Sequence, residues 1–439
     1  MGALHSTVTG EEQDFRPRNE STVGANGQSN TRGHYVFQMP KRTHETTRKD
    51  FEYLIGKLEH LPASTQKLFS LGKLYLRAGL CQDVRGDGDQ TVRPVEEQTV
   101  PGITHTYRLG LEAEGASGDE TSQISTQVEE NSLSRHERYS SDSTRPNESD
   151  LGLFTPFVMS TPLYHMQTFT RWKVAYSLNN LYPFCYRKRR TTIYIQPLED
   201  FPDFFSSYRV QVGKLTLDFF QLLQSFVQIY FSGFESLVLS PVSLSSMDGQ
   251  VRSREHEVTS QKQYCVNDLH PLMQQLLPPD GLSVVGILWT DIYPEGYNFV
   301  LGEASATHRS AVISFGRFET KGYDLATHQD ISEVNGALLW KLFKTLSHET
   351  CHLLGLDHCQ FFHCAMNESG SVSEAMEQPL FLCPVCLRKL QQASQFDLLE
   401  RYQQLRQFLS AVFAQHDDSD RLRLSLDWLN SCIHYMTSL

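Results

Sequence analysis

The stretch His348–Cys386, which reads HETCHLLGLDHCQFFHCAMNESGSVSEAMEQPLFLCPVC, holds the most specific pattern in the chain. It opens with His348, Glu349 and His352 in the spacing H-E-x-x-H. Residues four apart lie on one face of a helix, so both imidazoles can point at one metal ion. Glu349 is offset from His348 by about 100° around the helix, which places its carboxylate beside the ion. The pattern predicts a metal-binding helix with an adjacent general base.

Gly355 and His358 extend this pattern to a third ligand. Glycine adopts positive φ without a steric penalty, so Gly355 allows a sharp turn that returns His358 to the same ion. Three protein ligands leave one tetrahedral position for water, which is typical of a catalytic zinc site. H-E-x-x-H alone is expected by chance in about 4% of chains of this size, and the two added residues lower this to roughly one in ten thousand. A helix with two hydrogen-bonded core histidines is therefore the weaker interpretation.

Four cysteines form a second pattern, C-x4-C-x18-C-x2-C, at Cys359, Cys364, Cys383 and Cys386. Two short-spaced thiolate pairs suit a closed tetrahedral zinc site that stabilises the fold. The C-x-x-C pair alone also occurs in redox motifs, but those lie in a βαβ context that this stretch lacks. Because Cys359 directly follows His358, the two ions would be close neighbours. The second ion would then brace the loop that presents the third histidine.

Together these residues resemble the archaemetzincins, zinc peptidases of the metzincin clan that add a four-cysteine zinc site to a three-histidine site. The resemblance is dense over about 348–400 and extends back to about 190. It implies two Zn²⁺ ions per chain, a catalytic ion and a structural ion, with ligands at His348, His352 and His358 for the first and at Cys359, Cys364, Cys383 and Cys386 for the second. It also implies that Glu349 is the general base, that Met366 lies in a turn beneath the metal, and that the enzyme acts on peptides in an aminopeptidase-like manner.

Strand and helix patterns upstream predict a mixed α+β or α/β fold. Strands are expected at 191–197, 236–242, 283–289, 298–303 and 310–318, and helices at 169–181, 212–231 and 266–277. This order predicts a mostly parallel sheet with one antiparallel edge. The resemblance implies a metzincin-like zincin, in which a twisted mixed sheet lies beside an active-site helix. An edge strand can align an extended peptide by β-augmentation, and 298–303 and 310–318 are both candidates.

The active-site helix is expected to begin at a capping box formed by Asp330 and Glu333. Its buried face holds leucines at helical spacing, namely Leu339, Leu342, Leu346 and Leu353. The same helix would therefore anchor the core and present the metal ligands. After the last cysteine, apolar periodicity predicts a helical C-terminal part with helices at 387–413 and 420–437.

Composition divides the 439 residues into a disordered tail, a helical segment, a disordered insert and a metallopeptidase domain, at 1–33, 34–81, 82–150 and 151–439. The tail is polar, and the helical segment shows leucine periodicity. The insert is rich in Gly, Ser, Thr, Glu and Gln, and it has too few large apolar side chains to offset ordering entropy. Within the domain, we expect a catalytic core at about 190–393 and C-terminal helices at 394–439.

The net charge of −12 argues against a general nucleic-acid-binding surface, which would be basic. The sequence has neither an opening apolar signal region nor an apolar run near about 18 residues, so neither export nor a transmembrane segment is expected. Nine cysteines, at least four of them suited to metal, indicate a reducing compartment. We expect a cytoplasmic location, with the nucleus as the alternative if the basic run at 187–190 is an import signal. Gly2 fits a myristoylation pattern that would allow membrane contact, although a free tail is the simpler interpretation.

The expected function is zinc-dependent hydrolysis of a peptide or protein substrate, with Glu349 taking a proton from metal-bound water. The alternative is a zinc-stabilised binding or scaffold protein whose insert recruits partners. Glu349 favours the enzyme, because a scaffold needs no carboxylate beside the ligands. The sequence leaves open the natural substrate, the choice between exopeptidase and endopeptidase action, and the oligomeric state.

Overall fold

The computed structural model describes residues 51–80, 106–110, 153–155, 166–181, 190–199, 201–247, 249–369 and 371–438. The expected tail at 1–33, the myristoylation pattern at Gly2 and most of the insert at 82–150 lie outside these residues. The basic run at 187–190 also lies outside them, except for its last residue. No helix within the described ranges is both long enough and apolar enough to span a bilayer.

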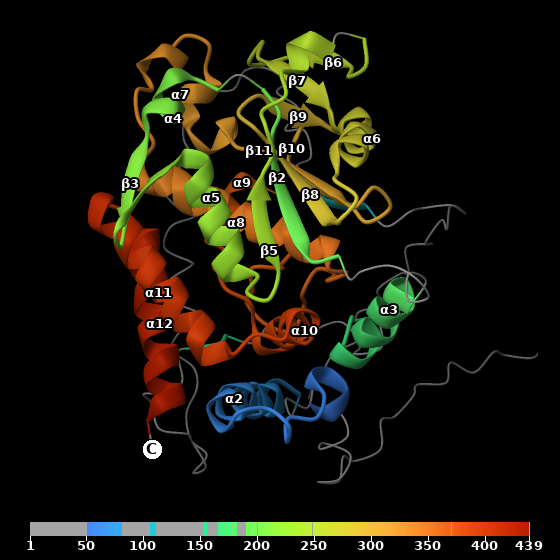
Figure 1. Cartoon of the computed structure of the whole chain (residues 1–439), viewed down its shortest axis with the longest axis vertical. Coiled ribbons are helices and arrows are strands. Elements are labelled where there is room, and N and C mark those ends of the chain that lie inside the picture. The colour runs from blue at the N-terminus through green and yellow to red at the C-terminus, as the bar shows by residue number, and fades with distance from the viewer. Residues whose placement is uncertain are drawn as a thin grey trace, which may run out of the picture.

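A mixed sheet forms the centre of the protein (Figure 1). Its parallel strands are β2 (Thr192–Pro197), β5 (Glu235–Val238), β8 (Gly281–Leu288) and β11 (Ser310–Ser314), and β10 (Val300–Ser305) lies antiparallel beside β11. The order along this part of the sheet is β5-β2-β8-β11-β10. This confirms the predicted mixed α/β fold and the parallel strands of its sheet. The predicted single antiparallel edge is wrong, because the sheet continues beyond β10 with further antiparallel pairings.

Beyond β10 the sheet continues through three short strands that the sequence did not predict, β9 (Asp291–Tyr293), β7 (Lys262–Cys265) and β6 (Ser253–Glu255). β9 runs antiparallel to β10 and pairs with it at Val300↔Ile292. β9 and β7 are parallel, and β7 and β6 are antiparallel. The remaining length of β10 is therefore not covered by β9.

Strand β1 (Thr106–Gly110) lies on that part of β10, pairing antiparallel from Thr106↔Ser305 to Arg108↔Glu303. The prediction of a disordered insert is therefore wrong for these five residues. An uncovered strand edge presents N–H and C=O groups that another strand can satisfy. Threonine and tyrosine favour strands, and this local preference is lost when composition is averaged over the whole insert.

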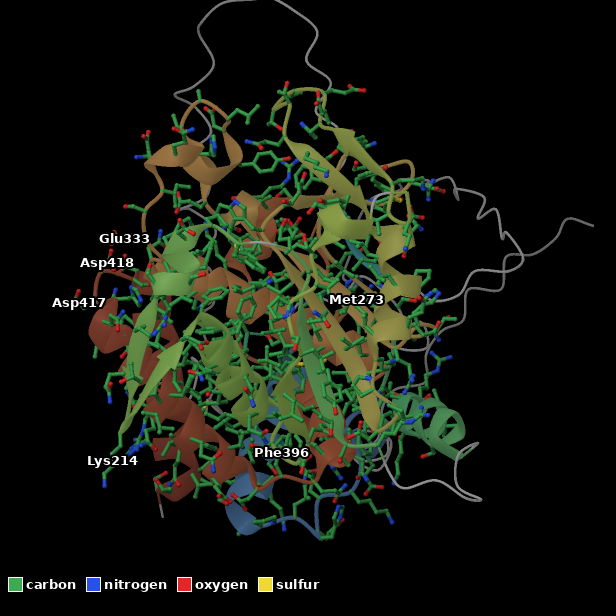
Figure 2. The ribbon with its side chains drawn as sticks, turned by 45° about the horizontal axis from the view of Figure 1, so that its top comes forward. Lys214, Met273, Glu333, Phe396, Asp417 and Asp418 are labelled. Carbon is green, nitrogen blue, oxygen red and sulfur yellow. The ribbon has the colours of Figure 1, made fainter. Side chains whose placement is uncertain are left out.

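Helices cover both faces of the sheet (Figure 1), with α5 (Phe219–Tyr230) and α8 (Gly336–Leu353) on one face and α6 (Val266–Leu276) on the other. Phe226 of α5 stacks on Phe343 of α8, with ring centroids 4.4 Å apart. On the opposite face, Met273 points from α6 toward the sheet and fills the space beside Gly286 of β8 (Figure 2). The helix that carries the histidines is thus part of the main core.

The helix expected at 212–231 is wrong in its first part. A hairpin precedes α5, formed by β3 (Arg209–Val212) and β4 (Leu215–Asp218). The hairpin turns at Gly213, which has φ +61°. Asp218 then caps α5, because its carboxylate accepts from the backbone N–H of Gln221 while the Gln221 side chain accepts from the N–H of Asp218. The capping box marks the start of the helix. The prediction placed the start too early because apolar residues at helical spacing continue upstream of Asp218.

The capping box expected at Asp330 and Glu333 is also wrong. Asp330 ends a short 3₁₀ helix, and α8 begins at Gly336. Asn335 is the N-cap, and its side-chain oxygen accepts from the backbone N–H of Leu338 at 2.7 Å. Asparagine is as good an N-cap as aspartate, so the sequence alone did not decide between the two starts.

The helix expected at 387–413 is two helices, α10 (Pro384–Ser394) and α11 (Leu398–Gln415). Gln395 adopts the left-handed conformation at φ +62° and ends α10. Asp397 caps α11 by accepting from the backbone N–H of Glu400 at 2.9 Å. The last helix, α12 (Asp420–Thr437), has the expected bounds.

The N-terminal helices α2 (Ala63–Leu80) and α3 (Phe169–Leu181) pack against α10, at the end of the protein opposite β6 and β7 (Figure 1). A further helical segment at 51–55 precedes α2, so the described part of the predicted helical segment 34–81 does contain helices. Gly72 of α2 lies directly against Pro384, the first residue of α10. The remaining short elements are α4 (Asp203–Ser207), α7 (Thr320–Tyr323), α9 (Val372–Glu377) and the 3₁₀ helices Leu244–Met247, Gly316–Phe318 and His328–Asp330.

Replacing Gly233 by alanine is expected to destabilise the protein by more than about 3 kcal/mol. Gly233 has φ +94°, and an added Cβ would lie 2.0 Å from the carbonyl oxygen of Ser394. Gly213→Ala is the matched control, because its φ is also positive but no atom lies within 4 Å of the added Cβ. That control should cost only about 1–2 kcal/mol of backbone strain. Urea unfolding of both variants measures the difference, and equal losses would contradict the clash.

Candidate metal centre

The last turns of α8 bring two imidazoles together. The Nε2 atoms of His348 and His352 are 3.0 Å apart. The helix reaches its C-cap at Leu354, and Gly355 then adopts φ +77°. This turn returns His358, so that the ligand atoms of all three histidines lie within 4.8 Å of one another. The structure therefore assembles the three histidines that the sequence pattern singled out.

Backbone carbonyls orient two of these rings. Nδ1 of His348 donates to the carbonyl of Ala365 at 2.6 Å, and Nδ1 of His352 donates to that of Leu356 at 2.6 Å. With Nδ1 as the donor, each ring directs an unprotonated Nε2 at the centre of the cluster. Burial lowers the pKa of both rings well below the usual histidine value, and neighbouring histidines lower it further. Neutral imidazole is the form that binds a metal ion.

The spacing of these nitrogens suits zinc. Tetrahedral Zn–N bonds of about 2.0–2.1 Å put two ligand nitrogens about 3.3 Å apart. The observed separation between the Nε2 atoms of His348 and His352 is 3.0 Å, close to that value. Three nitrogens occupy three tetrahedral positions and leave the fourth for water or substrate.

Glu349 lies on α8 beside the histidines and is fully buried. Neither carboxylate oxygen has a hydrogen-bond partner among the residues that the structure describes. Gly302 of β10 packs directly against it, because a Cβ at position 302 would come within 2.8 Å of the Glu349 side chain. Burial and then the nearby charge of Glu303 raise the pKa of Glu349 well above its usual value, while Lys344 lowers it. An unpaired buried carboxylate fits a site that a donor such as metal-bound water completes.

The four cysteines form a second buried cluster, with all Sγ atoms within 4.8 Å of one another. Sγ of Cys359 lies 3.6 Å from Sγ of Cys383, close to the roughly 3.8 Å of a tetrahedral site with Zn–S bonds of about 2.3 Å. A disulfide would require about 2.05 Å, and all four of these cysteines are free. Cys383 is the N-cap of α10, with Pro384 as the first helical residue and Cys386 in the first turn.

The charges of this cluster favour a bound cation. Burial raises the pKa of Cys383 well above the usual value, and hydrogen bonds with the other thiols raise it further. Burial also opposes ionisation of Cys359, but hydrogen bonds from its three neighbours lower its pKa well below the usual value. The surroundings therefore favour the thiolate form at Cys359 and oppose it at Cys383 and Cys386. A divalent cation stabilises all four as thiolates.

Asn367 organises the loop between the two clusters, and sequence reasoning missed it. Its Oδ1 accepts from the backbone N–H of Cys364 at 2.7 Å, and its Nδ2 donates to the carbonyl of Cys359 at 2.7 Å. The preceding residue, Met366, is fully buried, and its carbonyl accepts from the N–H of Cys359 at 2.7 Å. Asparagine is common in turns because its side chain bonds nearby backbone groups, but that signal is too general to find this residue.

Lys344 is a second residue that sequence reasoning missed. It is fully buried on α8, one turn before His348, and its Nζ donates to Oε1 of Gln378 at 2.8 Å. Burial lowers the pKa of Lys344 to about 8, although the charges of Glu349 and Cys364 raise it. One buried amine thus interacts with the acidic groups of both clusters. Nothing in the helical pattern of the sequence predicted that this lysine would be buried rather than exposed to solvent.

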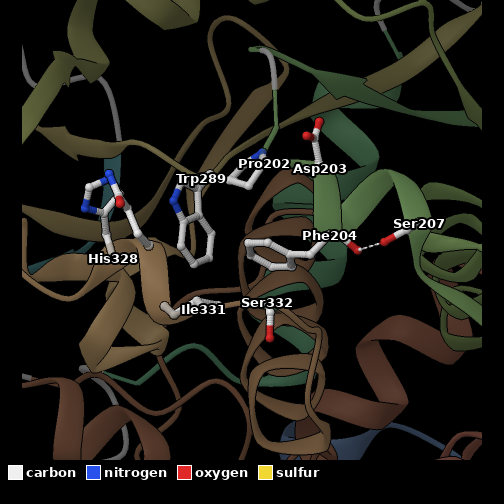
Figure 3. A pocket seen from close by; sticks show the side chains of 9 residues that line it. Pro202, Asp203, Phe204, Ser207, Trp289, His328, Ile331 and Ser332 are labelled. Atoms are coloured by element: carbon white, nitrogen blue, oxygen red, sulfur yellow. Dashed lines mark hydrogen bonds between the residues drawn. The ribbon is translucent and has the colours of Figure 1, made fainter.

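A pocket of about 520 Å³ lies elsewhere, near the carboxyl ends of β2 and β8 (Figure 3). Trp289 and Phe204 face each other across it, with Ile331 below and with Asp203 and His328 at its rim. The two aromatic rings meet edge to face, with centroids 6.0 Å apart. No residue that lines this pocket belongs to the histidine or cysteine cluster.

The sequence matches one family model and several named relatives. The model of peptidase family M54 matches residues 261–392. Archaemetzincin-2 of Rattus norvegicus is 32% identical over 244 residues, which cover 50% of this chain and 65% of the rat protein. Archaemetzincin-2 of Homo sapiens is 31% identical over 246 residues, which cover 47% of this chain and 68% of the human protein. The solved archaemetzincin of Archaeoglobus fulgidus has 26% identity, covers 45% of this chain and 99% of its own, and gives a TM-score of 0.30.

Replacing Cys383 by serine is expected to release zinc from the cysteine cluster and to lower Tm by more than about 10 °C, because α10 loses a metal cross-link at its start. His352→Ala should release zinc from the histidine cluster with a much smaller fall in Tm, since that cluster has fewer protein ligands. Elemental analysis and thermal unfolding of the two variants and the wild type check this. Unchanged zinc content in both variants would contradict the assignment.

Proposed function

Because the chain belongs to the archaemetzincins, peptidase family M54, we propose that it is a zinc-dependent peptidase that hydrolyses peptide bonds. Two zinc ions per chain are part of the proposal. His348, His352 and His358 would hold the catalytic ion, and the four cysteines would hold the structural ion. The three imidazoles leave a coordination position for the reaction, whereas four thiolates complete a tetrahedral site and leave none.

Each residue near the histidines has a defined task in this proposal. Zinc, when bound, polarises the peptide carbonyl and makes hydroxide available near neutral pH. Glu349 accepts the proton of the attacking water on a carboxylate oxygen and delivers it to the nitrogen of the leaving amine. The carbonyls of Ala365 and Leu356 hold two of the imidazoles in place throughout. Burial moves the pKa of Glu349 upward, toward the range in which a carboxylate can both accept and return a proton at neutral pH.

One observation carries the proposal. Among the described residues, the buried carboxylate of Glu349 has no hydrogen-bond partner, and Glu349 follows directly after His348, one of the three converging imidazoles. The second candidate, a zinc-stabilised scaffold protein, would need the metal sites for stability alone. Burying a carboxylate without a hydrogen-bond donor destabilises the fold, and a scaffold role would not require that carboxylate.

β10 is the strand that best suits the alignment of an extended peptide. Gly302 brings β10 against Glu349, and β-augmentation would place a peptide along the same strand. The other candidate, 310–318, is less suitable, because β11 lies between the long neighbours β8 and β10 along its length. β10 is also paired on both edges, by β11 on one side and by the short strands β9 and β1 on the other, so a peptide could reach it only by displacing β1. Since β1 pairs with β10 from Ser305 to Val300, a peptide aligned there competes with this segment of the chain.

The purified full-length chain should cleave members of a short-peptide library, and a chelator should abolish the cleavage. The resemblance also implies aminopeptidase-like action, so each peptide is tested with a free and with an acetylated N-terminus. Selective cleavage of the free forms supports that specificity, and equal cleavage supports endopeptidase action. A zinc-loaded protein that cleaves no peptide would favour the scaffold role.

Glu349→Gln is expected to lower kcat by about 10²–10⁴-fold, because glutamine has the same shape but cannot take the proton of the water. Zinc content should stay at the wild-type level, since Glu349 is not assigned as a ligand. Glu333→Gln is the control, an exposed glutamate near the start of α8 at the edge of the protein (Figure 2). Full activity in the Glu349 variant would refute the general-base role.

Gly302→Ala is expected to lower kcat by about 10-fold or more while zinc stays bound. The added Cβ would lie 2.8 Å from both Cγ and Oε1 of Glu349, so the carboxylate must shift. Steady-state kinetics and zinc analysis on the same preparation separate displacement of the base from loss of metal. Loss of zinc together with activity would show that the strand positions the ligands instead.

A further inference from the structure

The turn that presents His358 is held by a residue far away in the sequence. Gln167 lies just before α3, and its side-chain amide makes one hydrogen bond on each side of Leu356. Nε2 donates to the carbonyl of Gly355 at 2.9 Å, and Oε1 accepts from the backbone N–H of Asp357 at 3.0 Å. One planar amide therefore satisfies a carbonyl and an N–H that the end of α8 leaves outside its helical bonding.

Gln167 is itself fixed by Lys389, a buried residue of α10. Nζ of Lys389 donates to Oε1 of Gln167 at 2.7 Å and to its backbone carbonyl at 2.6 Å. The ammonium group also sets which way the amide faces, because an amide nitrogen cannot accept from it. Cys383 is the N-cap of α10, and Cys386 lies in its first turn. The contacts thus run from the helix of the cysteine cluster, through Lys389 and Gln167, to the histidine turn.

Two of the three imidazoles depend on this turn. His358 follows directly after Asp357, whose N–H Gln167 binds. The carbonyl of Leu356 accepts from Nδ1 of His352 at 2.6 Å and thereby orients that ring. The amide of Gln167 binds the backbone of Gly355 and Asp357, the residues before and after Leu356. It therefore fixes the Leu356 carbonyl, which accepts from His352, and the backbone that leads into His358.

We propose that Gln167 is a positioning residue for the histidine cluster. It acts through the Leu356 carbonyl and the backbone before His358. The inference rests on the metal-binding part of the function proposed above. Without the amide, the turn keeps its bonds to the last turn of α8, and Trp172 of α3 still donates to the carbonyl of Leu354 at 3.0 Å. The turn loses the two hydrogen bonds at Gly355 and Asp357, which flank Leu356.

The experiment compares Gln167→Ala with the wild type as full-length proteins. Zinc affinity of the histidine cluster is measured by competition with a chromophoric chelator, on protein whose cysteine cluster stays loaded. Hydrogen bonds that orient metal-binding histidines typically contribute 10–100-fold to metal affinity, so we expect binding to weaken by about 10-fold or more. Cobalt substitution assigns the loss, because thiolate-to-cobalt charge-transfer absorption reports the cysteine cluster and should be unchanged.

Gln228→Ala is the matched control. The amide of Gln228 makes the same pair of bonds at another turn, donating to the carbonyl of Phe234 at 2.8 Å and accepting from the N–H of Ser236 at 2.8 Å. The alanine substitution therefore removes one side-chain donor and one side-chain acceptor from a turn that carries no metal ligand. We expect some loss of thermal stability in this variant and wild-type zinc affinity at the histidines.

Gln167→Glu provides a second variant in case the alanine variant does not fold. A carboxylate still accepts from Asp357 and Lys389 but cannot donate to Gly355, so we expect an affinity between those of the wild type and of Gln167→Ala. Wild-type affinity in both Gln167 variants would overturn the inference, as would an equal weakening in Gln228→Ala. Failure of the wild type to bind zinc at the histidines would instead overturn the metal-binding part of the proposed function.

Discussion

The turn that leaves α8 at Gly355 is the constraint on which the site depends. A helix with 3.6 residues per turn can aim two imidazoles four residues apart at one point, but a third ligand must come from outside it. The turn supplies that ligand at His358, offers the Leu356 carbonyl that orients His352, and passes at once into the cysteine cluster. α8 is in turn anchored in the main core by residues such as Phe343. The positions of the three histidines therefore depend both on the geometry of this turn and on the packing of α8 in the core.

The charges buried around the two clusters form a balanced arrangement. Buried ionic groups cost free energy unless a partner of opposite sign lies nearby. Zinc with three neutral imidazoles would carry a net charge of about +2, and zinc with four thiolates about −2. These opposite charges would lie close together, with Lys344 interacting with both Glu349 and Cys364. The two clusters would therefore stabilise each other electrostatically as well as through the backbone.

Patterns with fixed short spacing were readable from the sequence, and contacts across long distances were not. Helical periodicity gives the i, i+4 relation of His348 and His352 directly, and apolar strands gave the parallel sheet. The start of α8 at Asn335 was missed because several residues there can cap a helix. Strand β1 was missed because its partner edge exists only in the folded sheet. Gln167 lies far from the turn it contacts, so no local pattern could reveal it.

One peptide bond separates a candidate ligand of the histidine cluster, His358, from one of the cysteine cluster, Cys359. Adding or deleting a residue there would move a donor atom by about 3.8 Å, whereas metal–ligand distances tolerate only about 0.2 Å. A change in chain length at this junction would therefore pull a donor atom out of at least one of the two clusters. A turn that carries no ligand, such as the one at Gly213, has no such restriction, because an added Cβ there meets no atom within 4 Å.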